Sequence, residues 1–192
     1  ALDGADYISV GSLSSSAVYG NSGADSLLIG GNATAASLFG GADNDLVSVS
    51  GNVSAGQIYT GSGVDEVIIT GSLVGSATVR LDNADASEEA ADSITIGNIS
   101  SGVIYGESGA DTFNISGDAR KASIYGGGQN DSVTVGGSLI SALVEGAEGA
   151  DNFKFADVTS STVKGGAGAD MFSATGLVTA GLVYGNLGND TI

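Results

Sequence analysis

The sequence predicts an all-β fold, a parallel β-solenoid of about ten coils with about 20 residues and two short strands in each coil. Three observations lead to this prediction: an aspartate that returns at a nearly constant interval, alternating apolar residues around it, and glycines between the alternating stretches. A fixed period of this length indicates one small unit stacked on copies of itself rather than a single compact core. We therefore expect one solenoid over residues 1–192, as a stretch of a longer repeat array.

The repeating aspartates mark the coils. They are Asp6, Asp25, Asp45, Asp65, Asp92, Asp111, Asp131, Asp151, Asp170 and Asp190. Consecutive sequence numbers in this series differ by 19 or 20, except for a single difference of 27 between Asp65 and Asp92. We place an insertion at about residues 81–91 in this step. We interpret it as a surface loop, with an altered acidic site as the alternative.

Two short strands are expected in each coil. The residues two and four positions after each aspartate are apolar, as Val47 and Val49 are, and mostly polar residues separate them. This period of two predicts a strand with one buried face. A second strand precedes the next aspartate, and in eight coils a large apolar residue stands seven positions before that aspartate (Leu38, Ile58), with a small residue two positions earlier. Consecutive coils then stack as parallel strands about 4.8 Å apart.

An outward column lies six positions before the aspartates, or twelve before Asp92 because of the insertion, and most of its residues are aromatic. The column is Tyr19, Phe39, Tyr59, Arg80, Tyr105, Tyr125, Glu145, Lys164 and Tyr184. We interpret it as a stacked ladder that supports a flat sheet, with a sugar-stacking strip as the alternative. Glu145 and Lys164 are neighbours of opposite charge, and Arg80 falls between two tyrosines, which favours the ladder.

Composition excludes several classes of function. The formal net charge is −17 with only five basic residues, so the chain repels nucleic acid and anionic membrane surfaces. Cysteine and histidine are absent, which excludes thiol chemistry, zinc sites and imidazole bases. No apolar run approaches the roughly 18 residues that a membrane-spanning helix needs, so we expect no membrane insertion. The basic residues are scattered, and we expect no enzymatic activity.

The turn before each aspartate predicts a metal site. Glycine stands two positions before the aspartate in seven of the ten turns, at Gly4, Gly23, Gly63, Gly109, Gly149, Gly168 and Gly188. Glycine allows left-handed backbone angles that let carbonyl oxygens converge, and a carboxylate beside such oxygens suits Ca²⁺. Stacked carboxylates repel by roughly 3 kcal/mol at an effective dielectric near 20, and an intervening cation reverses this. The alternative is that the aspartates only cap their turns by binding local N–H groups.

The turn Gly165-Gly166-Ala167-Gly168-Ala169-Asp170-Met171-Phe172 resembles the RTX (hemolysin-type) calcium-binding repeat, G-G-x-G-x-D-x-U-x. The resemblance implies a β-roll in which aspartate carboxylates and glycine carbonyls of adjacent turns share Ca²⁺. The motif recurs here once per coil rather than at every ninth position, and the opposite turn lacks the aspartate. We therefore expect several ions in one row along one edge. The turn before Asp92 has no glycine, which makes Asp92 the weakest member.

The resemblance and the composition together predict a structural role outside the cell. We expect a calcium-binding repeat region of a secreted bacterial cell-surface protein, in a surface layer or an extracellular filament, with an adhesin stalk as the alternative. Expected partners are further copies of the chain or neighbouring repeats, with a polysaccharide as a further candidate. Leu28, Leu46 and Ile68 should form a small outward apolar patch that favours assembly.

Ice binding is another activity to weigh for a single-row repeat of this kind. It requires a regular outward array of Thr and Asn at the calcium turn. The residues three and one before the aspartate change from Ser22 and Ala24 in one turn to Ala42 and Asn44 in the next. The sequence therefore predicts no regular lattice there.

Overall fold

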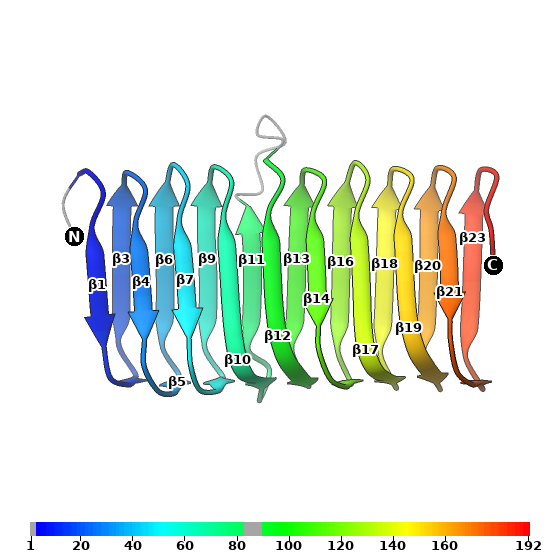
Figure 1. Cartoon of the computed structure of the whole chain (residues 1–192), viewed down its shortest axis with the longest axis horizontal. Helices are drawn as coiled ribbons and strands as arrows, with labels where there is room; N and C mark the ends of the chain where they lie inside the picture. Colours follow the sequence, from blue (N-terminus) through cyan, green and yellow to red (C-terminus); the bar gives the residue numbers. More distant parts are fainter. Residues whose placement is uncertain (1–2, 83–89) are drawn as a thin grey trace.

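The computed structural model describes residues 3–82 and 90–192, which form a flattened parallel β-solenoid (Figure 1). The coils stack along one axis, and the two chain ends lie at opposite ends of the stack. Within the described residues every regular element is a strand. None of these residues forms a helix long and apolar enough to cross a membrane. The all-β solenoid predicted from the repeat is confirmed.

The first face of the solenoid consists of the strands that follow the repeat aspartates. They are β1 (Tyr7–Val10), β4 (Ser26–Ile29), β7 (Leu46–Val49), β10 (Glu66–Val74), β12 (Ser93–Ser100), β14 (Thr112–Ile115), β17 (Ser132–Ile140), β19 (Asn152–Thr159) and β21 (Met171–Ala174). Each strand pairs in parallel with the equivalent strand of the next coil, so Leu27 lies beside Val47 and Val47 beside Val67.

The second face consists of the strands that precede the aspartates. They are β3 (Ala17–Ser22), β6 (Ser37–Ala42), β9 (Gln57–Ser62), β11 (Thr78–Asp82), β13 (Val103–Ser108), β16 (Ser123–Gly128), β18 (Leu143–Glu148), β20 (Thr162–Ala167) and β23 (Leu182–Leu187). Nine strands lie on each face of the described chain, although ten aspartates mark the coils. On the first face the last aspartate is followed only by an isolated bridge between Thr191 and Met171.

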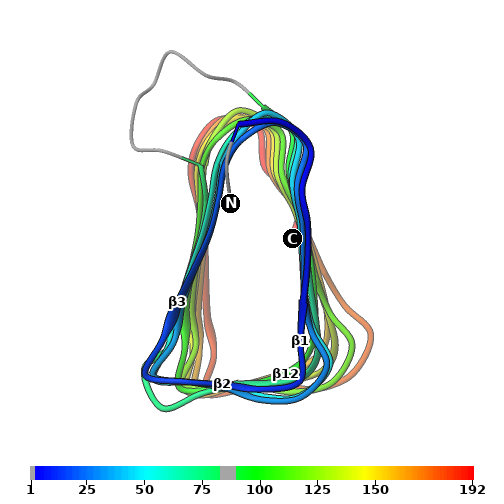
Figure 2. The same ribbon diagram turned by 90° about the vertical axis from the view of Figure 1, so that its left-hand side faces the viewer.

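The coil has a third, short side that the alternation pattern did not predict. Figure 2 shows it as the base of a three-sided outline, between the two long faces. Its short strands are β2 (Leu13–Ser14), β5 (Ala33–Thr34), β8 (Val53–Ser54), β15 (Ala119–Arg120) and β22 (Val178–Thr179). In other coils the first-face strand itself continues into this side. The segments expected to be simple turns thus contain inward residues such as Leu73 and Leu139, which are fully buried and close the core.

Each inward position of the coil contributes one column of apolar side chains to the core. The residues two and four after the aspartates and seven before them are buried through the middle of the stack, as Val47, Val49 and Leu38 illustrate. Large rings stack inside towards the C-terminal end, with the centroids of Phe153 and Phe172 4.8 Å apart. Burial of these columns supplies the main driving force for stacking the coils.

The outward column on the second face is a stacked ladder, as expected. Ring centroids of Tyr19 and Phe39 are 4.7 Å apart, and those of Phe39 and Tyr59 are 5.5 Å apart, with nearly parallel planes. The Arg80 guanidinium lies 4.7 Å from the centre of the Tyr105 ring. Further along the column, Lys164 and Glu145 form an ion pair with an N–O distance of 3.3 Å.

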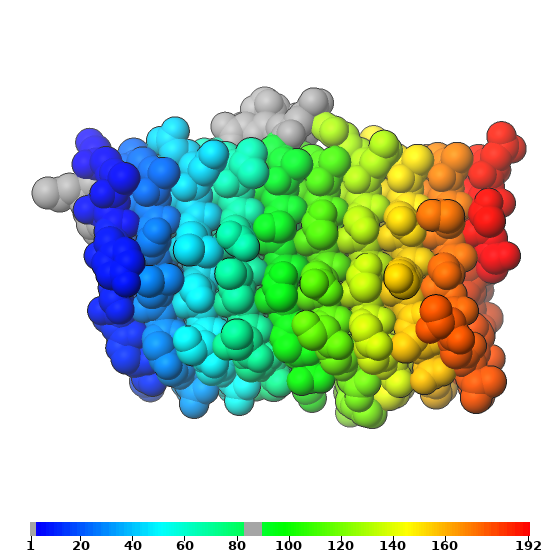
Figure 3. Space-filling view, in the orientation of Figure 1, coloured from blue at the N-terminus to red at the C-terminus, as the bar shows by residue number. Residues whose placement is uncertain are grey.

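The outward residues of the first face form rows along the solenoid axis (Figure 3). Leu28, Leu46 and Ile68 are half-buried in these rows. Ser48 lies between Leu28 and Ile68 in one row, while Leu46 belongs to the neighbouring row. The expected apolar patch is therefore interrupted, because the register places the three side chains in two different rows.

The insertion begins later than the sequence predicts. Leu81 and Asp82, which the predicted boundaries of 81–91 include, are the last residues of β11 and are buried. The segment 83–89, and with it the expected surface loop, lies outside the described residues. Beyond it, Ala90 stacks beneath Gly109 of the next turn. The solenoid therefore regains its register by the time the chain reaches Asp92.

Candidate metal centre at the aspartate edge

The ten repeat aspartates lie at one edge of the solenoid, where the chain passes from the second face to the first. We call this the aspartate edge, and each repeat aspartate with its preceding turn a rung. The eight aspartates from Asp25 to Asp170 are each only 1–3% exposed. Parallel register places each aspartate beside its equivalent in the next coil, so the column follows from the fold alone.

One oxygen of each carboxylate is bound by the neighbouring rung. The backbone N–H of every repeat aspartate from Asp6 to Asp170 donates to Oδ1 of the next one, at 2.7–3.0 Å. This ladder runs without a break across the long step of the series, where the N–H of Asp65 donates to Asp92. Asp92 therefore occupies its place in the column, although its turn lacks glycine.

The other oxygen has no such donor. Oδ2 is buried and has no hydrogen-bond partner in nine of these residues: Asp6, Asp25, Asp45, Asp65, Asp92, Asp111, Asp131, Asp151 and Asp170. A buried charged oxygen without a partner costs free energy, so native proteins normally pair such atoms with a donor or a cation. A row of nine such oxygens indicates a repeated cation site along the aspartate edge.

Burial raises the pKa of six of these carboxyl groups, those of Asp45, Asp65, Asp92, Asp111, Asp131 and Asp151. Desolvation is the main cause, while the hydrogen bond from the preceding rung lowers the pKa in part. The resulting pKa is about 8 for Asp92 and Asp131, about 7 for Asp45 and Asp111, and about 6 for Asp151. Negative charges on adjacent rungs add to the shift, for example those of Asp111 and Asp151 on Asp131. The edge is thus an array of buried carboxylates whose ionised forms are disfavoured by burial and by their neighbours' charge.

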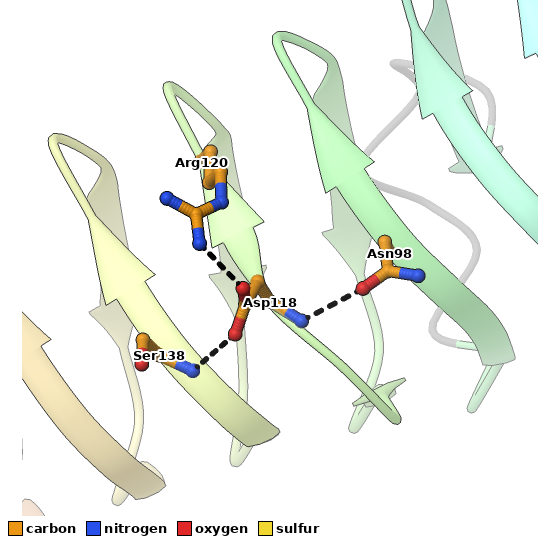
Figure 4. Close-up of polar contacts among 4 residues, drawn as sticks. All are labelled: Asn98, Asp118, Arg120 and Ser138. Carbon is orange, nitrogen blue, oxygen red and sulfur yellow. Dashed lines mark hydrogen bonds and ion pairs between the residues drawn. The ribbon is translucent and has the colours of Figure 1, made fainter.

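The opposite edge of the same molecule provides an internal comparison (Figure 4). There Asp118 accepts a hydrogen bond at Oδ1 from the N–H of Ser138, at 2.8 Å. Its Oδ2, however, receives the Arg120 guanidinium at 2.7 Å and is partly exposed. These contacts lower the pKa of Asp118, the hydrogen bond from Ser138 being the larger cause. A carboxylate in a similar ladder is therefore stable as an anion where it is partly exposed and accepts hydrogen bonds from both an N–H group and a guanidinium.

A space without a side chain lies beside most of these unbound oxygens. The residue five positions before the aspartate is glycine in seven rungs: Gly20, Gly40, Gly106, Gly126, Gly146, Gly165 and Gly185. A methyl group at Gly20 would overlap with Oδ2 of Asp25 and with the carbonyl oxygen of Gly40 in the next rung. Both oxygens therefore face the same open position between two rungs. We call it the inter-rung position.

The glycines expected to be calcium ligands have a structural reason of their own. Those two positions before the aspartate have φ between +108° and +147°, a region that favours glycine. A methyl group on Gly168 or Gly188 would also overlap with the carbonyl oxygen of the equivalent residue in the preceding rung. Their left-handed backbone and close stacking account for glycine here. Their role as ligands stays a prediction.

The oxygen set of the aspartate edge fits a hard cation. Ca²⁺ takes carboxylate and carbonyl oxygens at about 2.3–2.6 Å and accepts irregular geometry. Each inter-rung position between glycine-bearing rungs offers a buried Oδ2 and a main-chain carbonyl, and a divalent ion there would supply the missing positive charge. Among the described residues no three acidic side chains gather at one point, so such a site would depend on carbonyls as well as on carboxylates.

The chain resembles a solved structure over nearly its whole length. This is the crystal structure of a hyperactive, Ca²⁺-dependent, β-helical antifreeze protein from an Antarctic bacterium. The TM-score is 0.87 and the identity 28%, over 98% of this chain and 57% of that one. The present chain is a β-solenoid with a Ca²⁺-dependent structural neighbour. It spans little more than half the length of that protein. No protein-family model and no curated protein matches the sequence, so the RTX relationship rests on motif resemblance.

Two features of the edges were not predicted from the sequence. The glycines five before the aspartates were visible as the first residue of most turns, but only the fold places them beside Oδ2. The opposite edge was expected to lack aspartate, yet Asp118 and Asp157 lie there and accept N–H groups from Ser138 and Leu177. Their spacing does not follow the main series, and the signal is an Asn or Asp six or seven positions after some of the repeat aspartates.

Proposed function

We propose that this chain is a structural calcium-binding repeat region of a secreted bacterial cell-surface protein. Ca²⁺ between successive rungs would neutralise the stacked carboxylates and thereby drive folding and rigidity. The observation that carries the proposal is the row of nine buried Oδ2 atoms without hydrogen-bond partners. The inter-rung carbonyl that faces the same space, and the calcium dependence stated for the structural neighbour, support the choice of ion.

The ion would do electrostatic rather than catalytic work. Ca²⁺ at an inter-rung position would be held by Oδ2 of one aspartate and by the carbonyl oxygen five residues before the next. The positive charge would favour the ionised carboxylates, whose pKa burial otherwise raises. Because a site of this kind needs two stacked coils, the free energy of binding becomes free energy of folding.

Circular dichroism in the presence and absence of a chelator tests this proposal. At pH 8 we expect the chain to lose most of its β signal in EDTA and to recover it at millimolar Ca²⁺, the concentration at which extracellular modules bind. Mg²⁺ at the same concentration serves as the control and should restore much less. A spectrum that EDTA leaves unchanged would contradict the calcium ladder.

The proposal also places the chain outside the cell, where two structural roles compete. A stiff solenoid suits a surface layer or filament, in which copies associate, and it also suits an adhesin stalk, in which neighbouring repeats of one chain are the only partners. Negative-stain microscopy of the calcium-loaded chain separates these roles. Sheets or filaments would favour a lattice, whereas single particles at high concentration would favour the stalk. A polysaccharide partner can be tested in the same preparation by co-sedimentation.

Ice binding is the second candidate, because the structural neighbour is an antifreeze protein. The outward residues of the aspartate edge weaken it, since the position directly before the aspartate holds Ala24, Asn44, Val64 and Ala91 in four successive rungs. An ice-binding surface requires a more regular array. We expect the calcium-loaded chain to show no thermal hysteresis in a freezing-point assay, and a clear hysteresis gap would reverse this order of candidates.

A further inference from the structure

The inter-rung positions are not all alike. In seven rungs the residue five before the aspartate is glycine, whereas the equivalent positions of two successive rungs hold Thr60 and, ahead of the insertion, Leu81. Tyr59 pairs with Arg80 in the sheet. The residues that follow them, Thr60 and Leu81, are therefore neighbours in the same column. Both side chains are fully buried. The two gaps that flank Asp92 therefore contain protein atoms where the other gaps have open space.

Thr60 supplies the contact that an ion would otherwise make. Its hydroxyl donates a hydrogen bond to the carbonyl oxygen of Leu81. That carbonyl is the equivalent of the Gly40 carbonyl, which faces the open inter-rung position beside Asp25. In the gap between Asp65 and Asp92, one of the two oxygens offered to a cation is thus already bound by a neutral donor, and the Thr60 side chain occupies the space beside it.

Leu81 fills the next gap, between Asp92 and Asp111. Its side chain is completely buried and belongs to the apolar core. An isobutyl group beside a carboxylate excludes water and offers no oxygen to a cation. By contrast, a methyl group at Gly106, one rung further on, would overlap with Oδ2 of Asp111 and the carbonyl oxygen of Gly126, so that gap is open.

We infer that the calcium row consists of two separate segments, because the side chains of Thr60 and Leu81 take the ion positions on both sides of Asp92. This inference rests on the proposed function and sharpens it. Ions occupy the gaps between Asp25 and Asp65 in one segment, and those between Asp111 and Asp190 in the other. The glycine pattern opens six gaps among the described residues. The residue that would decide the gap between Asp6 and Asp25 lies outside them.

The structure places the cause of the break in β9 and β11, at the ends that lead into the turns. The break in the calcium row does not depend on the absence of glycine from the turn before Asp92. The N–H to Oδ1 ladder also continues through both closed gaps, from Asp65 to Asp92 and from Asp92 to Asp111. The two segments therefore remain parts of one solenoid, joined by hydrogen bonds and core contacts instead of ions.

Native mass spectrometry of the whole chain in volatile buffer with Ca²⁺ tests the inference, because it counts the ions bound to each folded molecule. We expect Thr60→Gly to bind one ion more than the wild type, and Leu81→Gly likewise. Thr60→Val is the matched control, since it removes the hydroxyl but keeps a side chain of the same size. Its ion count should equal that of the wild type.

The reverse substitution keeps the test decisive if the glycine variants fold poorly. Gly40→Thr introduces a threonine into an open gap and should reduce the count by one ion. An unchanged count in both Thr60→Gly and Gly40→Thr would overturn the inference, since a side chain at this position would then not control occupancy. A wild-type chain that binds no Ca²⁺ at all would instead contradict the proposed function, and the two failures are thus distinguishable.

Discussion

At the scale of single residues, the two oxygens of each repeat aspartate have different surroundings. Oδ1 caps the N–H of the preceding rung, while Oδ2 is buried without a donor. Capping and ion binding, which seemed alternatives from the sequence, therefore use different atoms of the same group. The donor to Oδ1 is also not local, as an ordinary turn cap would require, but belongs to the neighbouring coil. This division predicts opposite effects of one substitution with and without calcium.

Asp131→Asn should stabilise the chain without calcium and destabilise it with calcium. The amide oxygen keeps the bond from Asp111, while the buried group with a pKa of about 8 is replaced by a neutral one. At pH 6, where the calcium-free chain should keep its fold, we expect in a chelator a gain of at least about 1 kcal/mol in the free energy of unfolding, and at millimolar Ca²⁺ a loss of similar size. Urea titrations followed by circular dichroism measure both values.

Asp157→Asn is the matched control for that experiment. Asp157 lies at the opposite edge, where its Oδ1 accepts the N–H of Leu177, and asparagine can keep this bond. We expect a change below about 0.5 kcal/mol in either condition, as for most surface substitutions. If Asp131→Asn behaved like this control in both buffers, the electrostatic account of the aspartate edge would be wrong.

The glycine five before the aspartate gives a second test at residue scale. Gly146→Ala places a methyl group on Oδ2 of Asp151, so we expect a loss of about 1–3 kcal/mol in the calcium-loaded state. Gly128→Ala serves as the control, because only the Glu107 carbonyl oxygen lies near, at 3.8 Å. Thermal or urea unfolding should therefore separate the two. Equal losses would mean that the space beside Oδ2 is not special.

At the scale of elements, the strands of the second face are joined by side chains as well as by their backbones. The flat stacking of Tyr19, Phe39 and Tyr59 requires equivalent residues to lie directly beside one another, which parallel register provides. Since these rings lie outside the core and away from the aspartate edge, they should stabilise the solenoid independently of any ion.

Phe39→Ala should therefore destabilise the chain without affecting its ions. The substitution removes two stacked pairs, each worth about 0.5–1.5 kcal/mol, so a loss of about 1–3 kcal/mol is expected. Tyr184→Ala is the comparison, since Tyr184 is 45% exposed and follows Lys164 in the column. Tyr184→Ala should lower the free energy of unfolding by less than Phe39→Ala does. An altered calcium stoichiometry in Phe39→Ala would show that the ladder and the aspartate edge are coupled.

At the scale of the whole molecule, a net charge of −17 and a buried row of carboxylates make stability depend on pH and calcium together. Six of the repeat aspartates have a raised pKa, between about 6 and about 8. Groups of this kind stabilise the fold while they are protonated, and this contribution disappears as the pH rises through their folded pKa. Asp118 acts in the opposite sense, because its pKa is lowered.

Without calcium, the chain should thus be most stable in mild acid. In a chelator we expect the free energy of unfolding to fall by at least about 2 kcal/mol between pH 5 and pH 9, because up to their raised pKa the folded aspartates hold protons that the unfolded chain has already released. At millimolar Ca²⁺ this fall should disappear, since ions compete with protons for the same oxygens. Melting temperatures measured across this range test both statements, and a calcium-free chain that gains stability with rising pH would contradict them.

Much of this molecule could be read from periodicity. The constant spacing of Asp25, Asp45 and Asp65 dictated the stacking, and the alternation around Val47 dictated which side chains face inward. Such features are visible because each coil repeats the same local rule. The outward aromatic column followed in the same way, since parallel register brings Tyr19 beside Phe39.

The third side of the coil could not be read in this way. Its strands have only two residues in several coils, which is too short for alternation to be recognised, although Val53 and Leu73 there are buried. The interrupted apolar row had a similar cause: Leu28 and Leu46 are both outward, but which row each joins depends on register.

The sequence by itself determined the solenoid, the aspartate column and the hard-oxygen chemistry, because these depend only on residue types at a fixed period. Tertiary structure alone decided how each carboxylate is used, since the donor to Oδ1 and the space beside Oδ2 come from neighbouring coils. It also placed Thr60 and Leu81 where seven other rungs have glycine. Their effect on the row depends on contacts between one coil and the next, which no local pattern in the chain expresses.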